Sequence, residues 1–177
     1  MTTPESPTTP SDTPTALASG LEMRTGLEFA DRQLGHRKDI DQRCFHSVED
    51  VEGGAVLSKF WAREHVASST YLTVQVDRDK HILLTPERLQ YINHSCEPNV
   101  FFDTTRFELV SLTSIRAGAE LCYFYPSTEW NMAQPFACKC GSPDCIETIR
   151  GASEISTAIL RRYRLNTHIE DLLREPA

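Results

Sequence analysis

Short runs of alternating apolar and polar residues predict β-strands along most of the chain from Arg43 onward. The run TYLTVQV (70–76) places Leu72, Val74 and Val76 on one face, which is the period of two of a half-buried strand. Four further runs have the length and the β-branched or aromatic content of strands: 55–61, 81–84, 107–112 and 120–125. Strands this short, with few helical segments between them, predict a mostly β fold of short antiparallel sheets.

The C-terminal residues change to a helical period. SEISTAILRRYR (153–164) has helical spacing, and THIEDLLRE (167–175) begins with Thr167 three residues before Glu170. This spacing is that of a capping box, in which the two side chains satisfy free backbone N–H groups at the start of a helix. The sequence therefore predicts two short C-terminal helices.

The N-terminal residues have almost nothing to bury. Residues 1–20 are dominated by Thr, Pro and Ser, and four of the ten prolines lie there, which predicts a disordered tail. This stretch has neither the basic start nor the apolar segment of a secretory signal. No apolar run approaches the roughly 20 residues that a membrane span needs. We therefore expect a protein that is nuclear or cytoplasmic, with no transmembrane segment.

Length and charge restrict the possible partners. A chain of 177 residues is long enough for one domain and short for two. The formal net charge of −7 argues against direct nucleic-acid binding through a basic surface. It is compatible with a cationic partner, although mild acidity also serves solubility alone. The expectation is a monomer that binds neither nucleic acid nor membrane.

The run QYINHSCEPNVFF (90–102) places polar residues between apolar flanks. Asn93, His94 and Cys96 lie close together there, and flanking aromatic and branched residues draw the segment toward the core. Buried polar groups need hydrogen-bond partners or a ligand. The segment is therefore a candidate functional site, although a capping Asn and a His bonded to a buried carbonyl would explain the pair equally well.

Three cysteines lie within eight residues in FACKCGSPDC (136–145). As thiolates they would fill three corners of a Zn²⁺ tetrahedron, and a structural zinc site needs a fourth ligand. Cys44, Cys122 and the six histidines are candidates, but Cys96, already in a polar segment, fits best. The alternative is a set of free thiols. The predicted zinc ligands are Cys96, Cys138, Cys140 and Cys145.

Taken together, NHSCEPN (93–99), GAELCYFY (118–125) and FACKCGSPDC (136–145) resemble the SET-domain protein lysine methyltransferases, in the order of the family's motifs. The resemblance runs from about Arg43 to Gly151. It implies a SET-type fold with a knotted segment and a post-SET zinc loop. It divides the chain into the tail (1–20), a SET domain (21–135), a post-SET segment (136–151) and C-terminal helices (152–177).

The resemblance also implies roles for individual residues. Tyr125 is similar to the family's catalytic tyrosine, and Tyr123 and Tyr71 to aromatic residues that line its lysine channel. The implied contacts to S-adenosylmethionine (SAM) are Asn93, His94, Tyr125, Arg43 and Phe45. The implied reaction transfers a methyl group from SAM to the ε-amine of a protein or peptide lysine.

The residue types suit this chemistry. A lysine amine has a reference pKa near 10.4 and must lose a proton before it attacks a methyl group. An aromatic channel lowers that pKa by desolvation and holds the amine in line.

Several positions depart from the family's pattern around its cofactor site, and three readings follow from this. They are an active lysine methyltransferase, a non-catalytic SET-like module that binds a protein, and a SET-like enzyme acting on another acceptor such as a small-molecule amine. The departures are Asp41, Arg43, Pro86, Glu87, Gln90 and Phe124.

Overall fold

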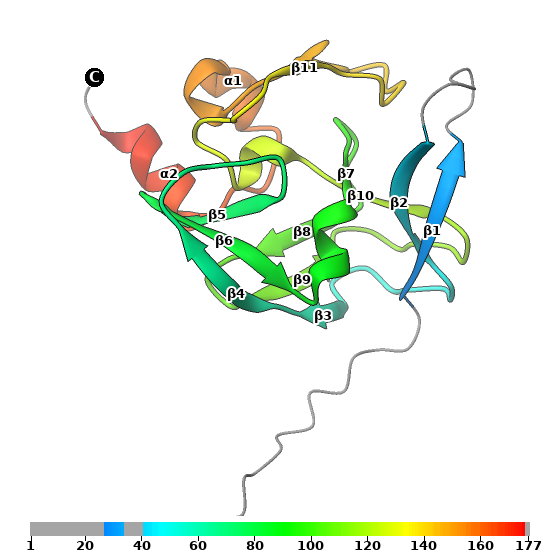
Figure 1. The fold of residues 1–177 in the computed structure, drawn as a ribbon. Helices are drawn as coiled ribbons and strands as arrows, with labels where there is room; N and C mark the ends of the chain where they lie inside the picture. Colours follow the sequence, from blue (N-terminus) through cyan, green and yellow to red (C-terminus); the bar gives the residue numbers. More distant parts are fainter. Residues whose placement is uncertain (1–26, 34–40, 176–177) are drawn as a thin grey trace, which may run out of the picture.

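Short strands form four small sheets in this computed structural model, which describes residues 27–33 and 41–175 (Figure 1). The predicted disordered tail, 1–20, lies outside these residues. The strands are β1 (Leu27–Gln33), β2 (Asp41–Ser47), β3 (Val56–Lys59), β4 (Trp61–Val66), β5 (Thr73–Asp77), β6 (Lys80–Thr85), β7 (Asn93–His94), β8 (Val100–Asp103), β9 (Glu108–Ser111), β10 (Glu120–Tyr123), β11 (Phe136–Ala137) and β12 (Thr148–Ile149). The helical elements are the 3₁₀ turns η1 (Glu87–Tyr91), η2 (Tyr125–Ser127) and η3 (Ala152–Glu154), and the α-helices α1 (Thr157–Leu160) and α2 (Thr167–Arg174).

The prediction of a mostly β fold with short antiparallel sheets and two short C-terminal helices is confirmed. The sheets have the orders β1-β2-β10-β7, β3-β9-β8, β4-β6-β5 and β11-β12. All their pairings are antiparallel except that of β10 with β7. None of the helices within the described residues is long and apolar enough to span a membrane.

Three predicted strands differ from the structure by more than one residue at an end. The run 55–61 splits at Phe60, a buried residue whose N–H donates to the carbonyl of Phe107 (2.9 Å). The run 70–76 starts as a strand only at Thr73, because the hydroxyl of Thr73 accepts a hydrogen bond from the N–H of Thr70 (2.8 Å) and holds a turn. In the run 120–125 the strand ends at Tyr123, and η2 begins two residues later, at Tyr125.

The segment expected to be knotted folds tightly against β10. In the parallel pair of β7 and β10, Asn93 lies opposite Cys122 and His94 opposite Tyr123. Further along, the backbone N–H of Asn99 donates to the carbonyl of Cys122 (3.0 Å), and the N–H of Cys122 donates to Oδ1 of Asn99 (2.8 Å). Because both ends of residues 93–99 are bonded to one strand, the polar motif is fixed beside the residues that follow Tyr123.

Two hydrophobic clusters stabilise this arrangement. The larger contains Phe45, Phe102 and Tyr123, with the rings of the last two 4.8 Å apart. The smaller contains Phe124, Ala152, Leu160 and Ile169. Residues after 150 thus contribute their own apolar contacts and fasten the chain end to the strand that leads to Tyr125.

The C-terminal helices are shorter than predicted. Only α1, a single turn, forms within 153–164, because Ile155 and Ser156 are extended and separate it from η3. The predicted capping box at Thr167 and Glu170 is wrong, since Asn166 is the N-cap of α2 and its side chain makes no capping bond.

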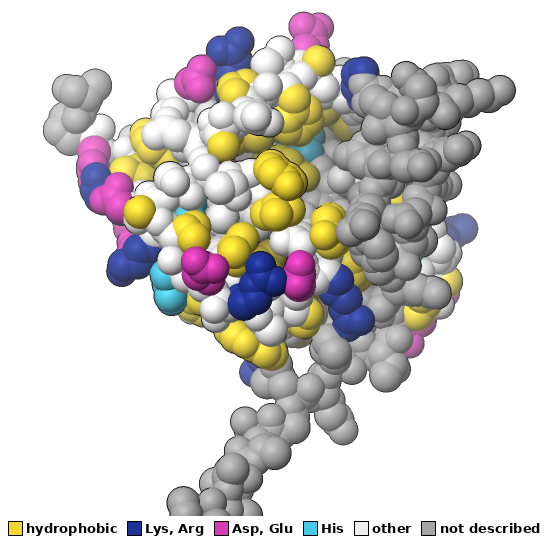
Figure 2. All heavy atoms as spheres, in the orientation of Figure 1, with side chains coloured by type: hydrophobic (Ala, Val, Ile, Leu, Met, Phe, Trp, Pro, Cys, Tyr) yellow, Lys and Arg dark blue, Asp and Glu magenta, His cyan; other side chains and the backbone are white. Residues whose placement is uncertain are grey.

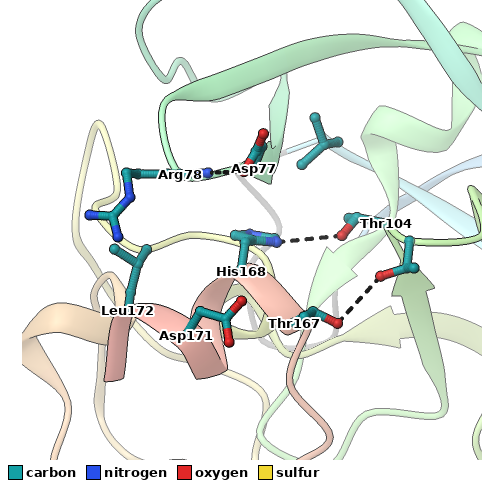
Figure 3. A pocket seen from close by; sticks show the side chains of 9 residues that line it. Asp77, Arg78, Thr104, Thr167, His168, Asp171 and Leu172 are labelled. Atoms are coloured by element: carbon teal, nitrogen blue, oxygen red, sulfur yellow. Dashed lines mark hydrogen bonds between the residues drawn. The ribbon is translucent and has the colours of Figure 1, made fainter. Parts of the chain in front are cut away.

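Asn166 instead joins distant parts of the chain. Its Nδ2 donates to the carbonyls of Phe102 and Ser127 (both 2.9 Å), and its Oδ1 accepts from the N–H of Thr104 (2.9 Å). A cavity of about 260 Å³ lies beside α2, and Figure 3 shows His168 of this helix next to Asp77 at the end of β5. On the other side, the ring of His168 bonds through Nε2 to the carbonyl of Thr128 (2.8 Å). Helix α2 therefore supports the loop that follows η2.

Candidate active site

Two cavities meet at one wall formed by Asn93, Tyr125 and Phe136. The larger, about 580 Å³, is called the aromatic cavity because Tyr71, Tyr91, Tyr123, Tyr125 and Phe136 line it. The smaller, about 250 Å³, is called the cysteine-side cavity, since Cys122, Cys138 and Cys140 line it with Asn93, His94 and Glu120. Figure 2 shows apolar side chains gathered near the centre of one face, over the loop between β4 and β5 of Figure 1.

Tyr125 is held at the shared wall by both its backbone and its hydroxyl. Its N–H donates to Nδ1 of His94 (3.2 Å), and its hydroxyl donates to the carbonyl of Ile92 (3.2 Å). The ring lies 4.6 Å from that of Tyr123. Burial raises the pKa of both hydroxyls, so each stays protonated at neutral pH and can act as a hydrogen-bond donor.

His94 connects Tyr125 to the cysteines. Burial lowers the pKa of its imidazole to about 3, so the ring is neutral at physiological pH. Because Nδ1 accepts from Tyr125, the proton is on Nε2, which lies 3.5 Å from Sγ of Cys96. The histidine therefore ties the position of the tyrosine to that of the cysteine.

Asn93 is oriented by a carboxylate of β10. Its Nδ2 donates to Oε1 of Glu120 (2.9 Å), and both side chains line the cysteine-side cavity. This bond orients the amide, with its Oδ1 as the acceptor side. The cavity thus offers an acceptor carboxylate and an oriented amide next to Tyr125.

The four predicted zinc ligands come together, and these cysteines fit the metal. The Sγ atoms of Cys96, Cys138, Cys140 and Cys145 all lie within 4.8 Å of one another, and those of Cys96 and Cys138 are 3.9 Å apart. Sulfurs at 2.3 Å from a tetrahedral zinc are about 3.8 Å apart. Of the alternative cysteines, Cys44 is buried and bonded to His46 (3.2 Å) and Cys122 is in β10, and neither belongs to this group of four.

Two implied cofactor contacts, Phe45 and Arg43, lie on β2. Phe45 is 0% exposed in the large core cluster, and its side chain lines neither cavity, so it is a core residue. Arg43 lies on β2, but its side chain is outside the described part of the structure. Tyr71, 82% exposed, lines the aromatic cavity from the loop before β5.

Two of the positions that depart from the SET-family pattern, Phe124 and Glu87, contact other side chains. The ring of Phe124 stacks on that of Tyr163, with centroids 3.7 Å apart and an angle of 6° between the planes. The hydroxyl of Tyr163 in turn donates to the carbonyl of Cys96 (3.0 Å). Glu87 forms an ion pair with Arg63 (2.7 Å). Phe124 thus serves to anchor the C-terminal segment near the cysteines.

Glu129, which the sequence analysis missed, lies in the aromatic cavity and is 6% exposed. Its Oε1 accepts from the N–H of Gln75 (2.8 Å) and the hydroxyl of Thr128 (3.2 Å). Burial raises its pKa to about 7, although those two bonds lower it in part. The sequence feature that could have pointed to Glu129 is an acidic residue soon after the tyrosine motif, between Thr128 and Trp130.

Comparison with known proteins decides the family. A family model described as the SET domain matches residues 20–126. This chain belongs to the SET-domain family. It is 42% identical over 129 residues to "Methyltransferase flvH" of Aspergillus flavus, and the match covers 72% of each chain.

More distant SET-domain proteins are far longer. The chain is 32% identical over 137 residues to the mouse "Histone-lysine N-methyltransferase, H3 lysine-36 specific", covering 71% of this chain and 5% of that protein. A crystal structure of KRYPTONITE in complex with mCHG DNA and SAH superposes with a TM-score of 0.50 at 22% identity. It covers 60% of this chain and 26% of that one, and it supports the SET fold alone. Both curated relatives are named as methyltransferases, which indicates methyl transfer as the chemistry of the family.

Proposed function

We propose that this protein transfers a methyl group from SAM to a lysine ε-amine of a protein or peptide. The observation that carries the proposal is the wall shared by the two cavities. Tyr125 and Asn93 line both of them, so a donor in one and an acceptor in the other would meet beside the Tyr125 hydroxyl. The histone-lysine methyltransferases among the relatives support a lysine as the acceptor.

The cysteine-side cavity fits the methyl donor. The Glu120 carboxylate and the Asn93 amide offer partners for the hydroxyl and ammonium groups that SAM carries. When bound, SAM supplies an electrophilic methyl group on a sulfonium. The SAH in the KRYPTONITE complex, the product that SAM leaves after transfer, supports the same choice of donor.

The aromatic cavity fits the acceptor. Tyr123 and Tyr71 would flank the aliphatic part of the lysine side chain. Removing this side chain from water would favour the neutral form of its amine. The Tyr125 hydroxyl would orient the amine toward the shared wall. This positioning would align the amine for in-line attack, and no covalent intermediate with the protein is needed. Neither Asn93 nor His94 needs to change protonation in this scheme.

Zinc has a structural role in the proposal. The four cysteines would hold it and thereby attach residues 138–145 to Cys96, whose neighbour His94 positions Tyr125. The metal would supply this cross-link and no step of the reaction.

A small-molecule amine is the second candidate acceptor. An aromatic cavity of about 580 Å³ is within the usual range for small-ligand sites. The relative flvH matches over most of its own length and is named only as a methyltransferase. These two observations favour a test in which both acceptor classes are offered.

The experiment uses SAM with a deuterated methyl group and detects the label by mass spectrometry. The purified zinc-loaded protein is offered lysine peptides in one reaction and a set of free primary amines in another. Label on a lysine ε-nitrogen supports the proposal, and label on free amines alone supports the second candidate. Saturable SAM binding without transfer to either class would favour the non-catalytic module.

A further inference from the structure

Glu129 is the one charged side chain among the described residues that line the aromatic cavity. The rest of the lining is aromatic, aliphatic or uncharged polar, with four tyrosines and Phe136. Aromatic faces and a single carboxylate both attract cations. The cavity is therefore built for a ligand with a positive charge and an apolar stem.

The carboxylate is held from several sides. While Oε1 of Glu129 accepts from Gln75 and Thr128, the side-chain Oε1 of Gln75 accepts from the N–H of Trp130 (2.8 Å). The backbone carbonyl of Glu129 accepts from the N–H of Ala152 (2.9 Å). A side chain fixed in this way can present its second oxygen in a constant direction.

Among the described residues, that second oxygen has no hydrogen-bond partner. Within the described part of the chain, both side-chain hydrogen bonds of Glu129 end on Oε1, and no ion pair joins it to a basic residue. A glutamine would satisfy the N–H of Gln75 equally well without burying a charge. The structural role alone therefore does not account for an acid here.

We propose that Glu129 is the acceptor-binding residue of this cavity: its free oxygen binds the protonated amine of the acceptor and takes the proton that the amine must lose. The inference rests on the proposed function for the reaction itself. It narrows the acceptor to amines that arrive as ammonium ions on an apolar stem, and it assigns the deprotonation step to a named residue.

The step is balanced. An N–H bond of the ammonium breaks, its electron pair stays on nitrogen as the attacking lone pair, and an O–H bond forms on Glu129. Because burial raises the pKa of Glu129 to about 7, this carboxylate is a stronger base than an exposed one. The open mouth of the cavity, beside the exposed Tyr71, lets the proton pass to water afterwards.

The test compares a charged and an uncharged probe of the same shape. Nα-acetyl-lysine methylamide and Nα-acetyl-norleucine methylamide are titrated into the full-length protein and followed by NMR, with and without SAH. The titrations are run near pH 8, above the pKa of Glu129. Glu129→Gln keeps an acceptor for the N–H of Gln75, and Glu64→Gln removes the same charge from an exposed site on β4.

We expect the wild type and Glu64→Gln to bind the lysine probe about tenfold more tightly than the norleucine probe. Glu129→Gln should lose most of this preference while binding SAH as the wild type does. Equal affinity of the wild type for the two probes, or a preserved preference in Glu129→Gln, would overturn the inference. Failure of the wild type to bind SAH would instead refute the proposed function, and the titrations without SAH would still decide the role of Glu129.

Discussion

Replacing Glu129 by glutamine should stabilise the protein above neutral pH. The carboxylate is 6% exposed, and burial raises its pKa from an ordinary value of 4.5 to about 7. The folded state therefore holds the proton more tightly than the unfolded chain. Ionisation of Glu129 therefore lowers the free energy of unfolding. Destabilising groups of this kind are common at functional sites.

The sign and size follow from these two pKa values. Between pH 4.5 and 7 the folded protein binds more protons, so its free energy of unfolding falls as pH rises through this window. Since each pKa unit corresponds to 1.36 kcal/mol, the full cost above pH 7 is about 3 kcal/mol. Most of this cost should develop between pH 5 and 8. Glutamine, which does not titrate, lacks this loss.

The assay is urea unfolding of wild type and Glu129→Gln at several pH values. The difference between their free energies of unfolding should grow in favour of the variant by about 2 to 3 kcal/mol from pH 5 to 8. Effects of pH on the cysteine cluster are common to both proteins and cancel in the difference. A constant difference across this range would show that the carboxylate is solvated.

Three further outcomes are expected. Tyr125→Phe should lower the rate of methyl transfer about a hundredfold or more with SAM affinity nearly unchanged in calorimetry; a variant as active as wild type would remove the role of this hydroxyl. Cys140→Ser should abolish stoichiometric zinc in elemental analysis and make residues 136–149 sensitive to protease, whereas unchanged metal content would argue against the predicted zinc site. Gly151→Ala should cost about 2 kcal/mol of unfolding free energy in urea titrations, because its new Cβ would lie 2.2 Å from the carbonyl oxygen of Trp130. Gly53→Ala, whose nearest contact would be 3.4 Å, should cost clearly less; equal costs would contradict the close packing at Gly151.

Much of this site was predictable because its chemistry is local in sequence. The spacing of Cys138, Cys140 and Cys145 limits the choices for a metal, and Cys96 stands in a polar run flanked by apolar residues. The strands with strong alternation or β-branched content were found for the same reason. Two-residue strands such as β7 have no period to detect, and β8, buried along its whole length, does not alternate.

What could not be predicted depends on long-range contacts. Phe124 looked like a lost acid, but its partner Tyr163 lies 39 positions later and stacks on it. The role proposed for Glu129 depends on Gln75 and on the tyrosines of the aromatic cavity, which come together with it only in the folded chain. The capping prediction at Thr167 failed because the side chain of Asn166 bonds to Phe102 and Ser127, which no local rule reveals.

The most direct test of the account is calorimetric titration of SAM into the zinc-loaded protein. We predict saturable binding of one SAM per chain, competition by SAH, and a thermal stabilisation of about 2.7 kcal/mol at a hundred times the dissociation constant. No heat of binding and no thermal shift at millimolar SAM would contradict the assignment of this SET domain as a methyltransferase.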